Sequence, residues 1–310
     1  MTGSEARRHF IKSALGAAAL ATPVARVLSA AAAGPLAAQT LTDSLILFTG
    51  AGGNVVAHRD ADGVALVDGG LAQYSKDLLH LVVHASGSDK VHTLFNTHWH
   101  PEQTGSNQRL GDAGARIIAH ENTRLWLTQA NPVPPRNYSY GPLPAKARPT
   151  KTFYYESEKL TLGDEPVEYG YLGQAHTDGD MYVYFRRSNV LVAGGPVAAP
   201  SAGWPLIDLK SNGWIMGLTD AVRQLAGIAN EQTVIVPANG PVLTRADLLA
   251  QQKMYGDIAG QLQKFLRLSL GPDEVVARAP GVAYEAQWGD SKYFVETAFR
   301  SLWGHMAPDA

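Results

Sequence analysis

The stretch that decides the fold is Phe95–Asn107, "FNTHWHPEQTGSN". It begins at the end of an apolar run and places His98 and His100 two residues apart. Because successive side chains of an extended segment alternate in direction, this spacing sends both imidazoles to the same side. Two further polar residues, Glu102 and Gln103, follow at once. The spacing predicts a metal site, and the amide at the last position raises the question of whether that site is complete.

A third histidine lies in a similar context. The segment Tyr171–Asp180, "YLGQAHTDGD", places His176 in a turn bracketed by glycines, after one predicted strand and before the next. A pair of histidines alone often just fills a polar turn, but three in strand-to-turn positions favour metal binding. The chain contains no cysteine, so the ligands of any metal must come from His, Asp, Glu or water.

The composition is that of a folded globular chain. With 310 residues, 45% of them hydrophobic and 17% charged, a large buried core is expected. We expect residues 41–305 to form a single domain. The formal net charge is −2 and there is no basic run, so nucleic acid is not an expected partner. A small-molecule substrate is expected instead.

Residues 1–33 have the plan of an export signal. The string Arg-Arg-x-Phe-Ile-Lys, which begins at Arg7 and Arg8, resembles the twin-arginine signal of bacteria, and an Ala-rich run with small residues follows it. We predict transport by the twin-arginine export machinery and a periplasmic or secreted location. The alternative is a chance basic pair before an Ala-rich helix. No stable membrane anchor is expected, because Pro23 and Arg26 interrupt the apolar run.

The rest of the chain alternates strand-like and helical patterns. Gly53–Gly70 has two apolar runs around a polar turn and predicts a β-hairpin, and Asp180–Val197 repeats that plan. A helix is predicted from about Leu71 to Gly87, and another after the capping box Thr244–Asp247. The order of elements predicts helices on both faces of a pair of packed sheets.

The segment Asn131–Pro149 contains six prolines, which we expect to exclude regular structure. A long irregular connection in a compact domain is typical of a lid or a binding loop. Tyr138 and Tyr140 are therefore candidates for contacts with a substrate. The alternative is a passive surface loop.

Five segments, taken in order, resemble the metallo-β-lactamase superfamily. They are the hairpin Gly53–Gly70 and the strings "THWHPEQTGSN", "GQAHTDGD", "VLVAGGPV" and "VIVPANGPV". The resemblance extends from about Asp43 to Trp303. It implies an α/β fold, a four-layer αββα sandwich with the active site at one edge between the two sheets.

The match to the ligand pattern of that superfamily is incomplete. His98, His100 and His176 stand at the three histidine positions that the resemblance assigns to the first metal. The positions that it assigns to the second metal are altered: Glu102 replaces an aspartate, Gln103 and Asn239 replace histidines, and Gly195 replaces the bridging aspartate. Neutral amides are poor ligands for such metals, so we predict one retained metal site and one lost site.

Three neutral imidazoles with one open position are typical of catalytic zinc. Glu102 is the candidate to orient the activated water or to act as general base. Its alternative role is a salt bridge or a hydrogen bond to a ligand histidine. Asp180 is a candidate for that kind of supporting contact.

These patterns lead to the hypothesis of an exported, mononuclear zinc hydrolase that acts on an ester, a lactone or an amide. Two alternatives stay open. Three histidines also suit iron or copper, so the chain could be an oxidoreductase on the same fold; Gly195 counts against this unless Glu102 supplies the carboxylate ligand. The other alternative is a non-catalytic protein that kept the fold and binds a metal or another ligand.

Overall fold

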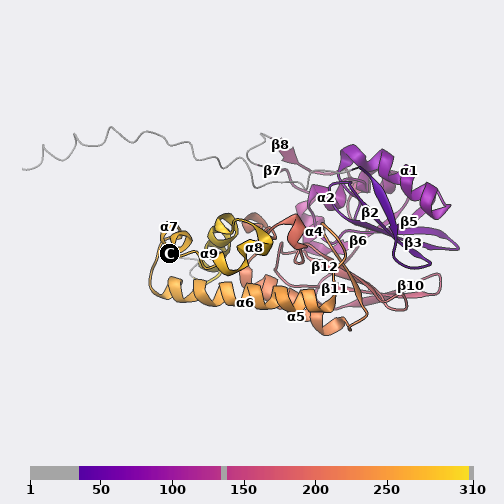
Figure 1. The fold of residues 1–310 in the computed structure, drawn as a ribbon. Helices are drawn as coiled ribbons and strands as arrows, with labels where there is room; N and C mark the ends of the chain where they lie inside the picture. The colour runs from indigo at the N-terminus through magenta and orange to yellow at the C-terminus, as the bar shows by residue number, and fades with distance from the viewer. Residues whose placement is uncertain (1–34, 134–137, 307–310) are drawn as a thin grey trace, which may run out of the picture.

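The computed structural model describes residues 35–133 and 138–306. The predicted export signal, residues 1–33, lies outside the described residues. In this part of the chain two β-sheets pack face to face, and helices cover the outer face of each sheet, which gives the layer order αββα (Figure 1). The predicted fold class and the four-layer sandwich are therefore confirmed.

The first sheet has the strand order β1-β2-β3-β4-β5-β6-β9. Its strands are β1 (Ala37–Thr40), β2 (Leu45–Thr49), β3 (Val55–Asp60), β4 (Gly63–Val67), β5 (Val91–Phe95), β6 (Arg116–His120) and β9 (Lys151–Phe153). From β1 to β4 neighbouring strands are antiparallel, whereas β4, β5, β6 and β9 run parallel. The carboxyl ends of the parallel strands therefore meet at one edge, and the loop that carries His98 and His100 begins there.

The second sheet has the strand order β10-β11-β12-β13-β14. Its strands are β10 (Glu158–Leu162), β11 (Glu165–Tyr171), β12 (Met181–Phe185), β13 (Val190–Gly194) and β14 (Val234–Pro237). The first four strands are antiparallel, and β14 joins β13 in parallel. The predicted hairpins are both present, as β3–β4 in the first sheet and β12–β13 in the second.

A core of apolar side chains fills the space between the two sheets. The first sheet contributes Leu47, Val67, Phe95 and Ile118, and the second contributes Tyr169, Val183, Phe185 and Val192, among others. Each such side chain stabilises the folded state by roughly 1.5–3 kcal/mol when it is removed from water. This packing fixes β5 against β11 and β12, so the loops that follow β5 and β11 meet at the same edge of the sandwich.

The helices divide between the two outer faces. Their bounds are α1 (Ser75–Ser86), α2 (Pro101–Thr104), α3 (Asn107–Asp112), α4 (Glu121–Trp126), α5 (Ile215–Ile228), α6 (Arg245–Arg267), α7 (Pro272–Ala277), α8 (Glu285–Trp288) and α9 (Lys292–Met306). Leu78 and Val82 of α1 and Leu110 of α3 pack on the first sheet, and α5, α6 and α9 cover the second (Figure 1). Across residues 35–133 and 138–306 no helix combines the length and the apolar character that a membrane crossing requires.

Two sequence patterns set helix boundaries as predicted. α1 ends at Ser86, directly before Gly87. α6 begins with the capping box, in which the side chains of Thr244 and Asp247 each accept a hydrogen bond from the backbone of the other residue. Both contacts satisfy backbone groups that the helix itself leaves unpaired.

The segment after α4 is more regular than its prolines predict. Asn131–Val133 forms β7 and pairs with Tyr138–Tyr140, which forms β8, so the expectation of no regular structure was wrong. The two strands make a small separate sheet in which Pro132 lies opposite Ser139. In a two-stranded ribbon each strand is an edge strand, and an edge strand tolerates proline because one of its sides carries no pairing partner.

Helix α5 approaches the loop before His176 closely enough to require a glycine. A Cβ atom on Gly217 would lie 1.6 Å from the carbonyl oxygen of Gln174. By contrast, a Cβ on Gly227 of the same helix would meet no atom within 4 Å.

We expect Gly217→Ala to lower the free energy of unfolding by about 2 kcal/mol or more, because the helix must move away from the loop. Gly227→Ala is the matched control and should be neutral or stabilising, by up to about 1 kcal/mol, since alanine favours the helix. Urea denaturation followed by circular dichroism measures both. Equal stability of the two variants would show that the close approach does not constrain α5.

Candidate metal centre

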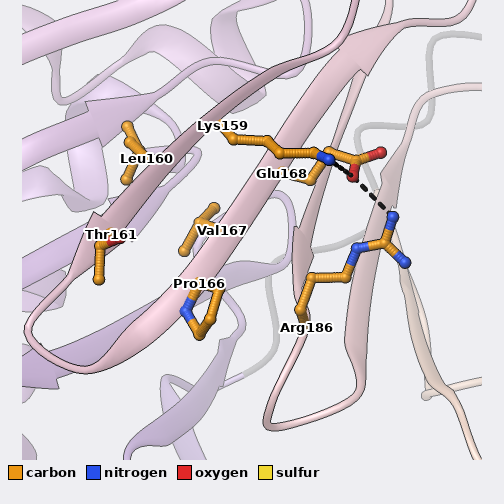
Figure 2. Close-up of a pocket in the computed structure, with 7 residues that line it drawn as sticks. All are labelled: Lys159, Leu160, Thr161, Pro166, Val167, Glu168 and Arg186. Carbon is orange, nitrogen blue, oxygen red and sulfur yellow. Dashed lines mark hydrogen bonds and ion pairs between the residues drawn. The ribbon is translucent and has the colours of Figure 1, made fainter.

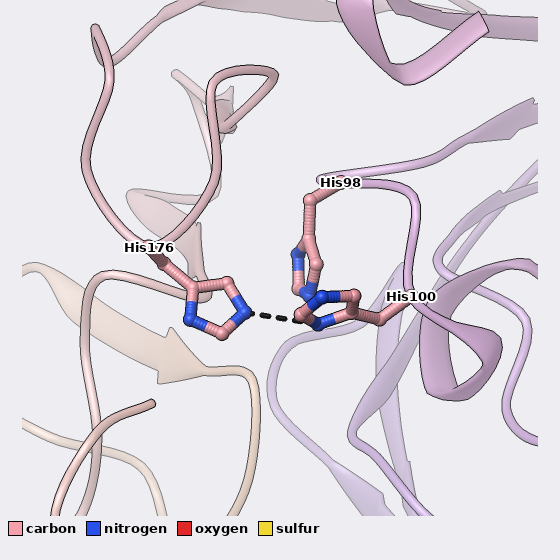
Figure 3. Close-up of side chains that lie close together, drawn as sticks. All are labelled: His98, His100 and His176. Atoms are coloured by element: carbon pink, nitrogen blue, oxygen red, sulfur yellow. Dashed lines mark hydrogen bonds between the residues drawn. The ribbon is translucent and has the colours of Figure 1, made fainter. Parts of the chain in front are cut away.

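Three histidines converge at the edge where the two sheets meet. His98 and His100 lie between β5 and α2, and His176 lies between β11 and β12. Figure 3 shows their rings converging from two loops, and one ring nitrogen of each lies within 4.8 Å of the others. His98 and His176 are 2% and 6% exposed, whereas His100 is half-buried. The group is therefore a cluster open to solvent mainly at His100.

The second ring nitrogen of each histidine has a partner of its own. Nε2 of His100 lies 3.0 Å from Oδ2 of Asp208, and Nδ1 of His176 donates to the backbone oxygen of Leu206 at 2.7 Å. Such partners select the tautomer and the ring orientation of a metal-binding histidine. They leave Nδ1 of His100 and Nε2 of His176 facing each other at 3.1 Å (Figure 3).

His98 is oriented through a threonine. Its Nδ1 lies 3.1 Å from the hydroxyl oxygen of Thr97. That hydroxyl donates to Asp68 at 2.8 Å, and the Thr97 backbone N–H donates to the same carboxyl at 2.8 Å. The hydroxyl oxygen is therefore free to accept from His98, which leaves Nε2 as the metal-facing atom. Asp68 is 1% exposed, and burial raises the pKa of its carboxyl to about 8.

Two of the three rings are held in the neutral form that binds metals. Burial, and next the proximity of the other two rings, lowers the pKa of His98 well below its usual value. Burial and the neighbouring His100 lower the pKa of His176 to about 3. For His100, burial also opposes the charged form, but the hydrogen bond and charge of Asp208 and the charge of Glu102 outweigh it and raise the pKa.

The residues present fit one metal ion. Three imidazole nitrogens converge, and each of the other ring nitrogens already has an acceptor, so the donor set needs no rearrangement of its hydrogen bonds. Three nitrogens and an open position are the donor set of catalytic zinc sites. His98, His100 and His176 are thus the residues that could hold the metal.

The Metallo-beta-lactamase superfamily model matches residues 49–214, which is more than half of the chain. This chain belongs to the metallo-β-lactamase superfamily. Among solved structures it is similar to a metallo-beta-lactamase from Pontibacter korlensis, with a TM-score of 0.58 and 18% identity over 72% of this chain and 99% of that one. It is also similar to the DIM-1 metallo-beta-lactamase, with a TM-score of 0.55 and 16% identity over 71% and 97% of the two chains. A third structure, VMB-1, gives a TM-score of 0.54 and 16% identity over 71% and 96%.

At these identities the likeness to solved structures shows the fold alone. A search of curated proteins found no match. Members of the superfamily bind metal ions, and the three histidines of this chain could hold one.

The positions that depart from the superfamily pattern do not form a second group of metal-binding side chains among the described residues. Glu102 lies in the first turn of α2 and is half-buried, and its side chain makes no hydrogen bond or ion pair with any residue that the structure describes. Gln103 is 2% exposed, and its Oε1 is buried without a partner among the described residues. In the amide orientation that satisfies both of its ends, Asn239 donates from its amide nitrogen to the backbone oxygen of Gly52 at 3.2 Å.

At Gly195 the departure is spatial as well as chemical. A Cβ atom there would lie 2.3 Å from Cδ2 of His176. No side chain, including aspartate, fits at this position while the His176 ring stays where it is. The glycine therefore leaves room for the His176 ring at a position where the superfamily pattern has an aspartate.

Asp180 supports the cluster indirectly. It is fully buried, and it accepts hydrogen bonds from the backbone N–H of Thr177 at 2.7 Å and from its hydroxyl at 3.0 Å. Burial raises the pKa of Asp180 to about 7. These contacts fix the turn directly after His176, and Asp180 does not bond to any of the three rings.

The two candidate substrate residues are placed differently. Tyr140 is 7% exposed and packs with Trp99 and Leu127. Its hydroxyl lies 2.6 Å from the hydroxyl of Thr104 in α2. It thus belongs to a small core beneath the site. Tyr138 is part of β8, and its side chain lies outside the described part of the structure.

Asp208, the partner of His100, was not predicted from the sequence. This carboxylate also accepts hydrogen bonds from the backbone N–H of Lys210 at 3.0 Å and from the hydroxyl of Ser211 at 2.6 Å. Burial acts against its charge, but the hydrogen bond with His100 outweighs burial and holds the pKa of Asp208 well below its usual range. The one available signal was an Asp three residues before a Ser in a turn, which is too common to indicate a site.

A separate hollow of about 540 Å³ lies on strands β10 and β11, beside Arg186, which follows β12, and includes none of the three histidines (Figure 2). Inside it, Glu168 accepts from Arg186 at 2.6 Å and from the hydroxyl of Tyr182 at 2.8 Å, and Lys159 lies 3.8 Å away. These contacts satisfy the carboxylate within the protein.

We expect Asp208→Asn to weaken metal binding by roughly 10–100-fold, because the amide cannot match a carboxylate as the acceptor that orients His100. A competition titration with a zinc chelator measures the affinity. Asp220→Asn is the matched control, since Asp220 pairs with Arg223 on the exposed face of α5. Unchanged affinity in Asp208→Asn would show that the carboxylate does not position the ligand.

Proposed function

We propose that this chain is a metal-dependent hydrolase with one zinc ion, held by His98, His100 and His176. The observation that carries the proposal is the convergence of three ring nitrogens within 4.8 Å, each on a ring whose other nitrogen is already bonded. When bound, zinc in such a site supplies an activated water at neutral pH and polarises a carbonyl group.

Other residues of the chain would orient the histidine rings and accept the proton of the attacking water. Asp208 holds the ring of His100, and Thr97 holds that of His98. Glu102 is the nearby carboxylate without an internal partner among the described residues, and its charge acts on His100. We assign it to orient the attacking water and to accept its proton.

A stoichiometry of one metal per chain is part of the proposal. Gln103 and Asn239 are neutral amides, which are weak ligands for zinc. Gly195 offers no side chain, and the His176 ring occupies the space that one would need. Glu102 alone supplies too few donor atoms to bind a second ion tightly.

The substrate class we propose is an ester, a lactone or an amide. Iron or copper in place of zinc would instead favour the oxidoreductase alternative. Absence of any metal after purification would favour the non-catalytic binding protein. Metal analysis of the protein as isolated separates these three outcomes.

We expect Glu102→Gln to retain the metal but to lower kcat for para-nitrophenyl acetate by about 10²-fold or more, since the amide cannot accept a proton. Zinc content and kcat are measured on the same preparation. Glu156→Gln, at an exposed residue, is the control and should leave both unchanged. Loss of zinc together with activity would make Glu102 a ligand, and full activity would remove it from the mechanism.

We also propose export by the twin-arginine route, on the basis of Arg7 and Arg8 before the Ala-rich run. The conservative double change Arg7→Lys and Arg8→Lys should leave the precursor in the cytoplasm, because this route requires the arginine pair. Cell fractionation measures the location of the protein, and mass spectrometry of its N-terminus measures whether the signal has been removed. Unchanged processing and periplasmic yield would contradict export by this route.

A further inference from the structure

Helix α9 presents a stripe of large side chains to solvent, on the side opposite to the core. Its buried side packs over the second sheet through residues such as Phe294, Phe299 and Leu302. The solvent-facing side carries what we call the α9 stripe, which consists of Tyr293, Glu296, Arg300 and Trp303. At 3.6 residues per turn, these four positions fall within about 80° of the helix circumference. They therefore form one continuous surface.

The α9 stripe has the residue types of a protein interface. Tyr293 and Trp303 are 42% and 37% exposed, and Trp303 leans on the buried ring of Phe299, with the ring centres 6.0 Å apart. Between these aromatic residues, Arg300 donates from Nε to Glu296 at 2.9 Å. Tyr, Trp and Arg are the residues that most often contribute strongly to binding between proteins.

The order of residues along the α9 stripe is self-complementary. Glu296 and Arg300 are each two residues from position 298, and Tyr293 and Trp303 are each five residues from it. When two copies of α9 lie antiparallel and meet at position 298, Glu296 of each copy is level with Arg300 of the other, and Tyr293 is level with Trp303. A two-fold contact requires this reciprocity, because one surface must complement itself.

We propose that α9 is the dimer interface of this protein, and that the α9 stripe packs antiparallel on the same stripe of a second copy of the chain. The two Glu296–Arg300 pairs then lie side by side in opposite order, so that four charges alternate in sign about the two-fold axis. The aromatic residues at both ends of the stripe shield these charges from water. Because the buried side of α9 already fixes the helix, association costs little conformational freedom of the backbone.

The same helix supports the segment beside the candidate metal centre. The ring of His305 in α9 stacks on Trp214, with the ring centres 4.4 Å apart. The helix also contacts Leu209–Ser211, the turn directly after Asp208. Dimer formation would therefore hold the element that positions His100. The interface itself does not depend on the reaction that the site performs.

Sedimentation velocity of the purified full chain over a concentration series measures the dissociation constant of the dimer. We expect Arg300→Glu to raise this constant by roughly tenfold or more, since like charges then face each other across the two-fold axis. The double variant Glu296→Arg with Arg300→Glu restores opposite charges and should recover most of the affinity. Trp303→Ala should weaken the dimer by roughly tenfold or more. Arg223→Glu, at an exposed ion pair on α5, is the matched control and should leave the dimer unchanged.

Crosslinking tests the antiparallel arrangement separately. The chain contains no cysteine, so an introduced thiol is unique. Lys292 and Gly304 are both exposed, and each is six residues from position 298. A short bismaleimide should therefore join Lys292→Cys to Gly304→Cys in a mixture of the two variants. Lys292→Cys alone should not crosslink, because its two copies would be about 18 Å apart along the helix pair.

Three results would overturn the proposal. The first is a monomer at every concentration up to the solubility limit. The second is a dimer that Arg300→Glu and Trp303→Ala leave unchanged, or that the double charge reversal does not recover while circular dichroism shows a folded chain. The third is crosslinking of Lys292→Cys to itself, which would mean that the two helices are not antiparallel about position 298.

Discussion

The candidate metal centre depends on the contact between His100 and His176. Their facing nitrogens are 3.1 Å apart, yet one ring belongs to the loop after the first sheet's β5 and the other to the loop after the second sheet's β11. The distance is therefore set by how the two sheets pack. Buried rings such as Phe95 and Tyr169, whose centres are 5.3 Å apart in the core between the sheets, hold that packing.

The polar surroundings then decide what the cluster can bind. Burial and mutual proximity keep His98 and His176 neutral by lowering their pKa values, while Asp208 supplies a negative charge behind His100. The three facing ring nitrogens could hold one cation. Gly195 contributes to the same arrangement, because the His176 ring fills the space that a side chain at this position would need.

The sequence predicted the parts of the fold and site that depend on local patterns. The three histidines, His98, His100 and His176, each follow a predicted strand. The alternation of side-chain direction within a strand and the flanking glycines can both be recognised in the sequence. Asp208 could not be predicted, because its role depends on a hydrogen bond with His100, which lies far away in the sequence and in another loop. The burial of Tyr140 likewise depends on packing against distant residues, as does the pairing of β7 with β8.

The number of metal ions per chain tests the account most directly. Crystals grown with excess zinc and examined by anomalous scattering at the zinc edge give the number and position of the ions together. The account predicts one fully occupied peak, bound by His98, His100 and His176, that is lost in His176→Ala and kept in Asn239→Ala. Two fully occupied peaks about 3.5–4 Å apart, the spacing of two-metal sites, would contradict it.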